Sequence, residues 1–160
     1  MGENVFITGP GGSGKSALIK KFVEYSQQQN IKYQVCSLTG ISAVLLKCNA
    51  RTIHSWAGIG LANGNNSIIA DKIKTNKHKK SNWIRIKLLI VDEVSMMSVK
   101  LFELLNLIGQ KCRNNDKYFG GIQIIFLGDF FQLPPIGIKD EPDTIKFCFE
   151  SKLWDNIFPI

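Results

Sequence analysis

The sequence lacks any apolar run near the roughly 20 residues needed to cross a bilayer. Its first twelve residues also lack the basic start and apolar stretch of a signal peptide, because Glu3 and several glycines interrupt them. These absences argue against a membrane-bound or exported chain. We therefore expect an intracellular protein with no membrane partner.

Cysteine and arginine are scarce. The four cysteines form no C-x-x-C pair, which disfavours a zinc site, and we expect them to pack as small core hydrophobes. Only three of the 20 cationic side chains are arginine, so the formal charge of +7 rests mostly on lysine. Charge of this kind is weak evidence for nucleic-acid binding by itself.

The pattern that is present indicates one α/β domain. A hydrophobic content of 44% and a charged content of 21% are typical of a globular chain without repeats or linkers. Apolar runs predict strands, and three- and four-residue periodicity predicts helices. The expected strands cover 4–8, 33–37, 87–91 and 122–127, and the expected helices begin near 15 and cover 41–48 and 99–112, before a final strand and helix pair over 146–158. Such alternation predicts an open, mostly parallel sheet with helices on both faces.

A phosphate-binding motif follows the first expected strand. Residues 9–16 read GPGGSGKS and fit G-x-x-x-x-G-K-[ST] between a strand and a helix. Backbone N–H groups of such a loop close around phosphate, while Lys15 would neutralise the β- and γ-phosphates and Ser16 would ligate Mg²⁺. A merely flexible glycine turn is the alternative, which the strand and helix context disfavours. The predicted nucleotide-binding residues are Gly9, Pro10, Gly11, Gly12, Ser13, Gly14, Lys15 and Ser16.

Two acids end the most apolar expected strand, in LLIVDE over residues 88–93. The carboxyl ends of parallel strands form the ligand-binding edge of such a sheet. Asp92 is placed to hold Mg²⁺, and Glu93 to polarise an attacking water as a general base. Taken alone, two acids after a strand would more often be a solvated turn, but beside a phosphate loop they predict nucleotide hydrolysis.

A third segment, GDFFQLPP over residues 128–135, follows the next apolar strand. Its prolines predict a stiff loop in which Gln132 could sense the γ-phosphate. The alternative is an ordinary loop with Phe130 and Phe131 buried in the core.

These motifs together carry a resemblance to a family. GPGGSGKS, TGISAVLL (39–46), RTIHSWAGIG (51–60), LLIVDEVSMM (88–97) and FGGIQIIFLGDFFQLPP (119–135) occur in this order over nearly the whole chain. The sequence thereby resembles the Pif-type DNA helicases. The resemblance implies a superfamily-one motor with two RecA-like domains and ATP-driven 5′-to-3′ movement on single-stranded DNA. It also implies Mg²⁺ as the metal, and duplexes and G-quadruplexes as substrates.

The family roles transfer to matching positions. The resemblance implies that Lys15, Glu93 and Gln132 are catalytic, with Gln132 coupling the γ-phosphate to movement. Four further residues match segments that line the single strand, where short polar groups can grip phosphates without reading sequence. These predicted DNA-binding residues are Thr39, Gly40, His54 and Ser55.

Two features are open to either interpretation. Trp56 could stack on a base or anchor its loop in the core. The seven cations within 72–87 could follow a phosphate backbone, although a solvated helix face is the better interpretation.

The expected assignment is therefore the first RecA-like motor domain over residues 1–160, incomplete and without the second motor domain. We expect a monomer that acts in the nucleus or, if viral, at a replication site in the host cell. An upstream segment that helps to hold adenine, and a later arginine that stabilises phosphoryl charge, both belong to the family pattern beyond these residues. The competing functions are a nucleotide kinase and a RecA-like module that binds nucleotide or DNA without turnover.

Overall fold

The computed structural model describes residues 2–160. Five strands are present: β1 (Val5–Thr8), β2 (Tyr33–Ser37), β3 (Arg51–Thr52), β4 (Leu88–Asp92) and β5 (Gln123–Gly128). The α-helices are α1 (Lys15–Gln28), α2 (Gly40–Leu45), α3 (Ile53–Ala57), α4 (Asn66–Thr75), α5 (Lys77–Arg85), α6 (Val99–Arg113) and α7 (Trp154–Ile157). Short 3₁₀ turns are η1 (Val94–Met96), η2 (Tyr118–Gly121), η3 (Pro142–Thr144) and η4 (Cys148–Glu150).

The strands form one parallel sheet in the order β1-β5-β4-β2-β3. Because every pairing is parallel, all the carboxyl ends meet at one edge of the sheet. The register places Ser37 of β2 beside Asp92 of β4 at this edge. The segments that follow β1, β2, β4 and β5 therefore begin close together in space.

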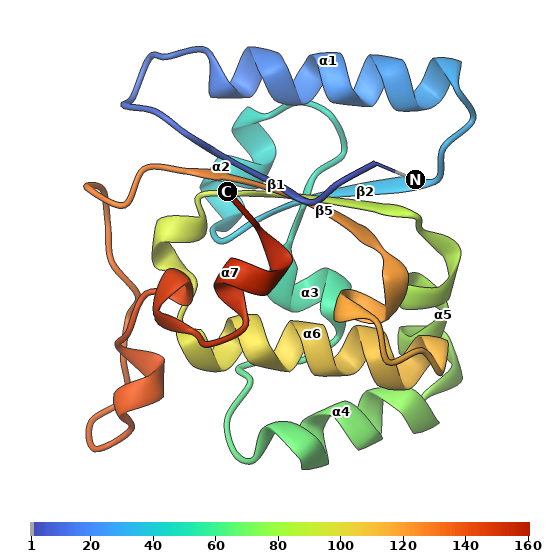
Figure 1. Ribbon diagram of the computed structural model, residues 1–160, viewed down its shortest axis with the longest axis vertical. Helices are drawn as coiled ribbons and strands as arrows, with labels where there is room; N and C mark the ends of the chain where they lie inside the picture. The colour runs from blue at the N-terminus through green and yellow to red at the C-terminus, as the bar shows by residue number, and fades with distance from the viewer. Residues whose placement is uncertain (1) are drawn as a thin grey trace.

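Helices cover both faces of the sheet, as the sequence predicts. The helix α1 lies on one face, and α6 lies on the other, with α4 beyond α6 and α5 beside its end (Figure 1). Side chains alternate along β4: Ile90 packs with Ile19 of α1, whereas Leu89 joins the larger core beneath α6. Alternation of this kind is what a strand buried on both faces requires.

The prediction of a final strand and helix pair over 146–158 was wrong. Phe147 makes only a single antiparallel bridge, with Ser98, and η4 follows it. The carboxylate of Glu150 accepts the Phe147 N–H at 2.7 Å, which curls the chain into a turn and removes that donor from any strand ladder. Only the short helix α7 remains of the expected pair.

The lysine-rich stretch belongs to two helices, α4 and α5, that the sequence did not resolve as separate elements. Lys72, Lys74, Lys77 and Lys79 are all exposed. This exposure favours the solvated-face interpretation. None of the described helices combines the length and apolarity that crossing a membrane requires.

A tight turn, η2, joins α6 to β5 at the amino edge of the sheet. Phe119, Gly120 and Gly121 all have left-handed backbones, with φ of 52°, 64° and 87°. The buried side chain of Asn106 accepts the Phe119 N–H at 2.8 Å. A Cβ on Gly120 would lie only 2.2 Å from the carbonyl oxygen of Gly109, so the turn and the helix touch backbone to backbone.

Candidate functional site

The loop between β1 and α1 has the conformation that its glycines predict. Gly12 and Gly14 have φ of 79° and 93°, a left-handed backbone in which other residues are strained. Gly14 also directly precedes α1, so the loop feeds its backbone N–H groups into a helix N-terminus.

The ammonium of Lys15 lies inside this loop. It donates hydrogen bonds to the carbonyl oxygens of Gly9 and Pro10, the latter at 3.0 Å, and to Ser13 Oγ at 3.3 Å. A lysine held over the loop in this way carries its charge where phosphate oxygens would lie.

A cavity of about 360 Å³ opens at the carboxyl edge of the sheet. It brings together residues from the β1–α1 loop, the end of β4 and the loop after β5. Its lining consists of Gly11, Gly12, Gly14, Lys15, Ser16, Asp92, Glu93, Gly128 and Gln132. The sequence-predicted nucleotide, metal and catalytic residues thus meet at one place, apart from Gly9, Pro10 and Ser13, which shape the loop behind it.

The two acids of this cavity lie in different surroundings. Asp92 is buried, and its burial raises the pKa of its carboxyl, while the Glu93 N–H that donates to it at 2.8 Å and the charge of Lys15 act to lower that pKa. Glu93 is half-buried and has a left-handed backbone with φ 58° and ψ 41°, which is uncommon for a residue other than glycine. Both side chains nevertheless line the same cavity.

The donor set suits Mg²⁺ with a nucleotide. A hard divalent cation prefers oxygen ligands and keeps water and phosphate oxygens in its shell, so a carboxylate from Asp92 and a hydroxyl from Ser16 are sufficient protein ligands. Across residues 2–160, no group of three or more His, Cys, Asp or Glu side chains is arranged to hold a metal alone. These residues would hold the metal only together with phosphate.

Gln132 lies opposite the phosphate loop. A Cβ on Gly11 would lie 3.5 Å from its side-chain nitrogen, so the amide is close to the loop backbone. The turn that presents it is closed by Gln132 N–H to the Asp129 carbonyl at 2.9 Å and by Phe131 N–H to Asp129 Oδ1 at 3.0 Å. Phe130 packs against the core as the alternative reading of this loop predicted, but Phe131 is fully exposed, which contradicts it.

The four predicted DNA-binding residues divide into two groups. Thr39 and Gly40 begin α2 beside the cavity, and Thr39 Oγ1 donates to Glu93 Oε2 at 3.3 Å. Ser55 lies on the surface, where its hydroxyl accepts from Arg51 at 3.2 Å. His54 is separate from both, because its ring lies among apolar side chains.

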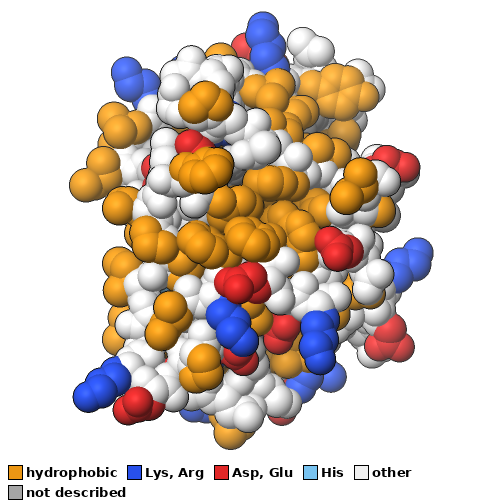
Figure 2. All heavy atoms as spheres, turned by 60° about the vertical axis from the view of Figure 1, so that its left-hand side comes forward, with side chains coloured by type: hydrophobic (Ala, Val, Ile, Leu, Met, Phe, Trp, Pro, Cys, Tyr) orange, Lys and Arg blue, Asp and Glu red, His pale blue; other side chains and the backbone are white. Residues whose placement is uncertain are grey.

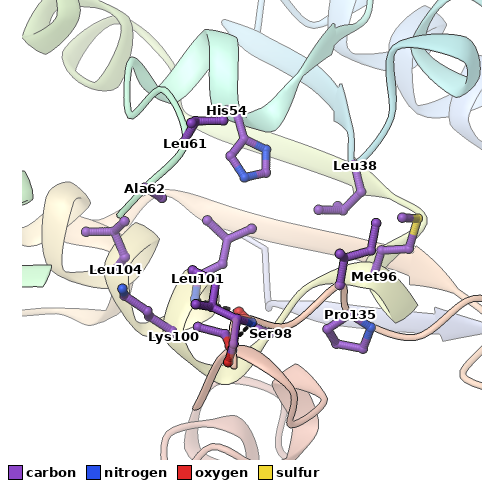
Figure 3. A pocket seen from close by; sticks show the side chains of 13 residues that line it. Leu38, His54, Leu61, Ala62, Met96, Ser98, Lys100, Leu101, Leu104 and Pro135 are labelled. Carbon is purple, nitrogen blue, oxygen red and sulfur yellow. Dashed lines mark hydrogen bonds between the residues drawn. The ribbon is translucent and has the colours of Figure 1, made fainter. Parts of the chain in front are cut away.

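A second cavity, of about 370 Å³, contains that His54 ring (Figure 3). Leu38, Leu61 and Met96 lie around it, and burial lowers the pKa of the imidazole. The neutral ring is therefore favoured here, which suits an apolar pocket better than a phosphate contact.

Trp56 is a core residue, so the possibility that it stacks on a base was wrong. Only 1% of it is exposed, and its ring lies 4.6 Å from that of Trp83 between centroids. Asn82 donates to the Trp56 carbonyl at 3.0 Å and fixes the same loop.

Sequence reasoning missed two features of this edge. The first is the contact between Thr39 and Glu93, which are 54 positions apart and carry no shared sequence signal. The second is an apolar rim, formed by the exposed side chains of Leu61, Phe131, Leu133 and Ile136. Figure 2, which brings forward this side of the molecule, shows hydrophobic side chains gathered across its middle. Exposed apolar side chains in loops resemble ordinary core residues in the sequence, and this explains why the rim was missed.

Comparison with known proteins decides which family has this arrangement. The sequence matches the family described as PIF1-like helicase over residues 1–160. The chain belongs to this family. It is 40% identical over 153 residues to the ATP-dependent DNA helicase RRM3 of Saccharomyces cerevisiae, covering 94% of the chain and 21% of the relative. It is 42% identical over 159 residues to the yeast ATP-dependent DNA helicase PIF1, covering 96% of the chain and 18% of the relative.

Solved PIF1-like structures agree with the fold. The crystal structure of Pif1 helicase from Candida albicans matches with a TM-score of 0.87 and 36% identity, over 99% of this chain and 35% of that one. A Bacteroides Pif1 in complex with ADP-AlF3 and ssDNA matches with a TM-score of 0.76 and 30% identity, over 94% and 35% of the two chains. The RecA-like α/β fold expected of a PIF1-like chain is confirmed. The chain spans about a fifth of the length of the two yeast relatives.

Proposed function

We propose that this chain is the ATP-binding first motor domain of a 5′-to-3′ DNA helicase, over residues 1–160. The observation that carries the proposal is the single cavity in which the phosphate loop, Asp92, Glu93 and Gln132 converge. Family membership and the ADP-AlF3 and ssDNA named for a related structure support ATP and single-stranded DNA as the ligands. Duplex and G-quadruplex substrates, action as a monomer and an intracellular site of action belong to the same proposal.

Each residue has a chemical task in this proposal. When bound, ATP with Mg²⁺ supplies the phosphoanhydride bond and the charge that the cavity must neutralise. Lys15 neutralises the β- and γ-phosphates, while Ser16 and Asp92 hold the metal. The carboxylate of Glu93 accepts a proton from the attacking water. Gln132, on the opposite wall, detects whether the γ-phosphate is present.

Single-stranded DNA would be bound along the carboxyl edge beside the cavity. Thr39, Gly40 and Ser55 offer backbone N–H groups and hydroxyls to phosphates, which gives binding without sequence preference. His54 would contribute by shaping the apolar pocket behind this surface rather than by a charged contact, since its burial favours the neutral ring.

A second candidate is a RecA-like module that binds nucleotide or DNA without appreciable turnover. The observation in its favour is that each of the three arginines already has hydrogen-bond partners within the domain. Arg51 contacts Ser55, Arg85 contacts Asn82, and Arg113 donates to the carbonyls of Trp83, Ile84, Ile86 and Gly120. Since an arginine at the transferring phosphate raises turnover about 10³-fold or more, a domain acting without one would hydrolyse ATP slowly.

The deciding experiment measures ATP binding and phosphate release for wild type, Glu93→Gln and Lys15→Ala, with and without single-stranded DNA. In a protein that joins this domain to a second motor domain, Glu93→Gln should keep ATP binding and lower DNA-stimulated turnover by about 10²- to 10⁴-fold, because only the general base is lost. Lys15→Ala should weaken binding itself. In the 160-residue chain alone we expect slow turnover in every variant.

Two results would contradict the proposal. Equal ATP affinity of wild type and Lys15→Ala would remove the phosphate-loop assignment. Wild-type turnover by Glu93→Gln would show that another residue activates the water. Binding of ATP and DNA with no turnover at either length would favour the module, and phosphate transfer to a nucleotide acceptor would favour the kinase.

A further inference from the structure

The hydroxyl of Thr39 joins two parts of the proposed machinery. It accepts the Ser42 N–H at 3.2 Å, which caps α2, and it donates to Glu93 Oε2 at 3.3 Å. The register of β2 and β4 makes this contact possible, because Ser37 lies beside Asp92. The segments that follow the two strands therefore leave the sheet at the same edge. One side chain therefore contacts the proposed general base and begins the segment proposed to bind DNA.

A hydroxyl carries one proton, so it can donate only one strong hydrogen bond at a time. Thr39 can donate to Glu93 or to a phosphate oxygen, but not to both. Its lone pairs still serve the Ser42 N–H in either state, so α2 keeps its cap while the donated bond changes partner. Thr39 is only half-buried, which leaves a phosphate room to approach.

The backbone of Glu93 limits any rearrangement to its side chain. Its N–H donates to Asp92 Oδ1 at 2.8 Å, and the residue sits at the sharp left-handed turn before η1. Loss of the bond from Thr39 would therefore free the carboxylate to turn within the cavity without moving β4.

We propose that Thr39 is a positioning residue that holds Glu93 in an unproductive orientation while no DNA is bound. A phosphate of single-stranded DNA then accepts the hydrogen bond from the Thr39 hydroxyl in place of Glu93. The released Glu93 carboxylate turns to accept a proton from water. This inference rests on the proposed function, because it requires both ATP hydrolysis at Glu93 and DNA contact at Thr39.

Binding linkage gives a test that needs no turnover. If DNA competes with Glu93 for one proton, weakening the Glu93 acceptor must tighten DNA binding. The amide of Glu93→Gln is a weaker acceptor than the carboxylate. The matched control is Asp92→Asn, which removes the same charge one residue away without touching Thr39. In the 160-residue chain without nucleotide, Glu93→Gln should bind a labelled oligo-dT roughly 3- to 10-fold more tightly than Asp92→Asn at about 0.15 M salt.

A kinetic test uses a second matched pair. In a protein that joins this domain to a second motor domain, Thr39→Val removes the donor and should raise DNA-free ATP turnover by roughly 10-fold, the effect of one hydrogen bond to a charged group. It should lower the DNA stimulation ratio equally. Thr52→Val is the control, since Thr52 caps α3 through the Ser55 N–H at the same 3.2 Å but does not contact Glu93. It should leave both quantities within twofold of wild type. Thr39→Ser should restore wild-type behaviour, and thermal melts verify that each variant is folded.

The outcomes separate the inference from the proposed function. Identical DNA affinities of Glu93→Gln and Asp92→Asn, or a fall in DNA-free turnover in Thr39→Val, would overturn the inference alone. A wild-type protein that binds no single-stranded DNA would overturn both. A wild-type protein with both motor domains that binds DNA but shows no turnover would overturn the proposed hydrolysis, and with it the release of a general base.

Discussion

The segment 119–135, FGGIQIIFLGDFFQLPP, contains β5, and its two ends serve different purposes. At the amino end, the Phe119–Gly121 turn packs against α6. The Phe119 N–H donates a buried hydrogen bond to Asn106 Oδ1, and Arg113 donates to the Gly120 carbonyl at 2.8 Å. At the carboxyl end, Phe131 and Gln132 are exposed, and their loop is closed only by its own short-range hydrogen bonds. The amino end builds the sheet, whereas the carboxyl end presents side chains to the cavity. A family-specific motif therefore does not mark a functional site along its whole length.

We expect the largest effect on stability from a substitution at the amino end of β5. Gly120→Ala places a methyl 2.2 Å from the Gly109 carbonyl oxygen, on a backbone whose φ of 64° already disfavours a side chain. Backbone cannot yield there as a flexible side chain can, so we expect a loss of roughly 4 kcal/mol or more in the free energy of unfolding. Urea denaturation measures it.

The neighbouring glycine supplies the control for that change. Gly121→Ala has a comparable φ of 87°, but its methyl would meet only the end of the Asn115 side chain at 3.3 Å. We expect a loss of about 1 kcal/mol from backbone strain alone. Equal losses for the two variants would show that backbone strain, and not the contact with Gly109, causes the loss of stability in Gly120→Ala.

The carboxyl end should respond in activity and not in stability. Gln132→Ala removes an exposed side chain, so the free energy of unfolding should change by less than about 0.5 kcal/mol. Turnover with DNA should nevertheless fall by roughly 100-fold, as expected for a polar group that contacts the reacting phosphate. Phe131→Ser in the same loop should change neither quantity. A large loss of stability in Gln132→Ala would remove the contrast between the two ends.

The smallest expected effect concerns pH. Burial lowers the pKa of His54 below its ordinary 6.5. As the pH falls, the imidazole therefore takes up its proton at a higher pH in the unfolded chain than in the folded chain. Stability should therefore be constant above that value and should fall as the pH drops below it. His54→Gln should lose less stability than wild type between pH 7.5 and 5.5. Parallel pH profiles for wild type and His54→Gln would show that the apolar pocket does not disfavour the charged ring.

Much of the fold could be predicted from sequence, because β1, β4 and β5 are apolar runs that end at or directly before a glycine or an acid. The strand β3 has two residues, too few to show a period, and was missed. The error at Phe147 arose because a side chain, Glu150, took the donor that a strand would need, which composition does not reveal.

The candidate site was predictable where its residues are consecutive, as in the phosphate loop or Asp92 with Glu93. Relations between distant segments were not predictable. Whether Trp56 faces DNA or the core, and whether Thr39 reaches Glu93, depends on which strands are neighbours and in which register. A single sequence contains no direct record of either.

The left-handed backbone at Glu93 has a consequence for the engineering of this domain. An L-residue with a side chain costs about 1 kcal/mol in that conformation, a cost that glycine largely avoids. The position proposed for the general base is therefore one where the best residue for folding and the best residue for chemistry differ. Selection for thermal stability alone would favour Glu93→Gly, and would trade catalytic power for heat resistance at a single codon.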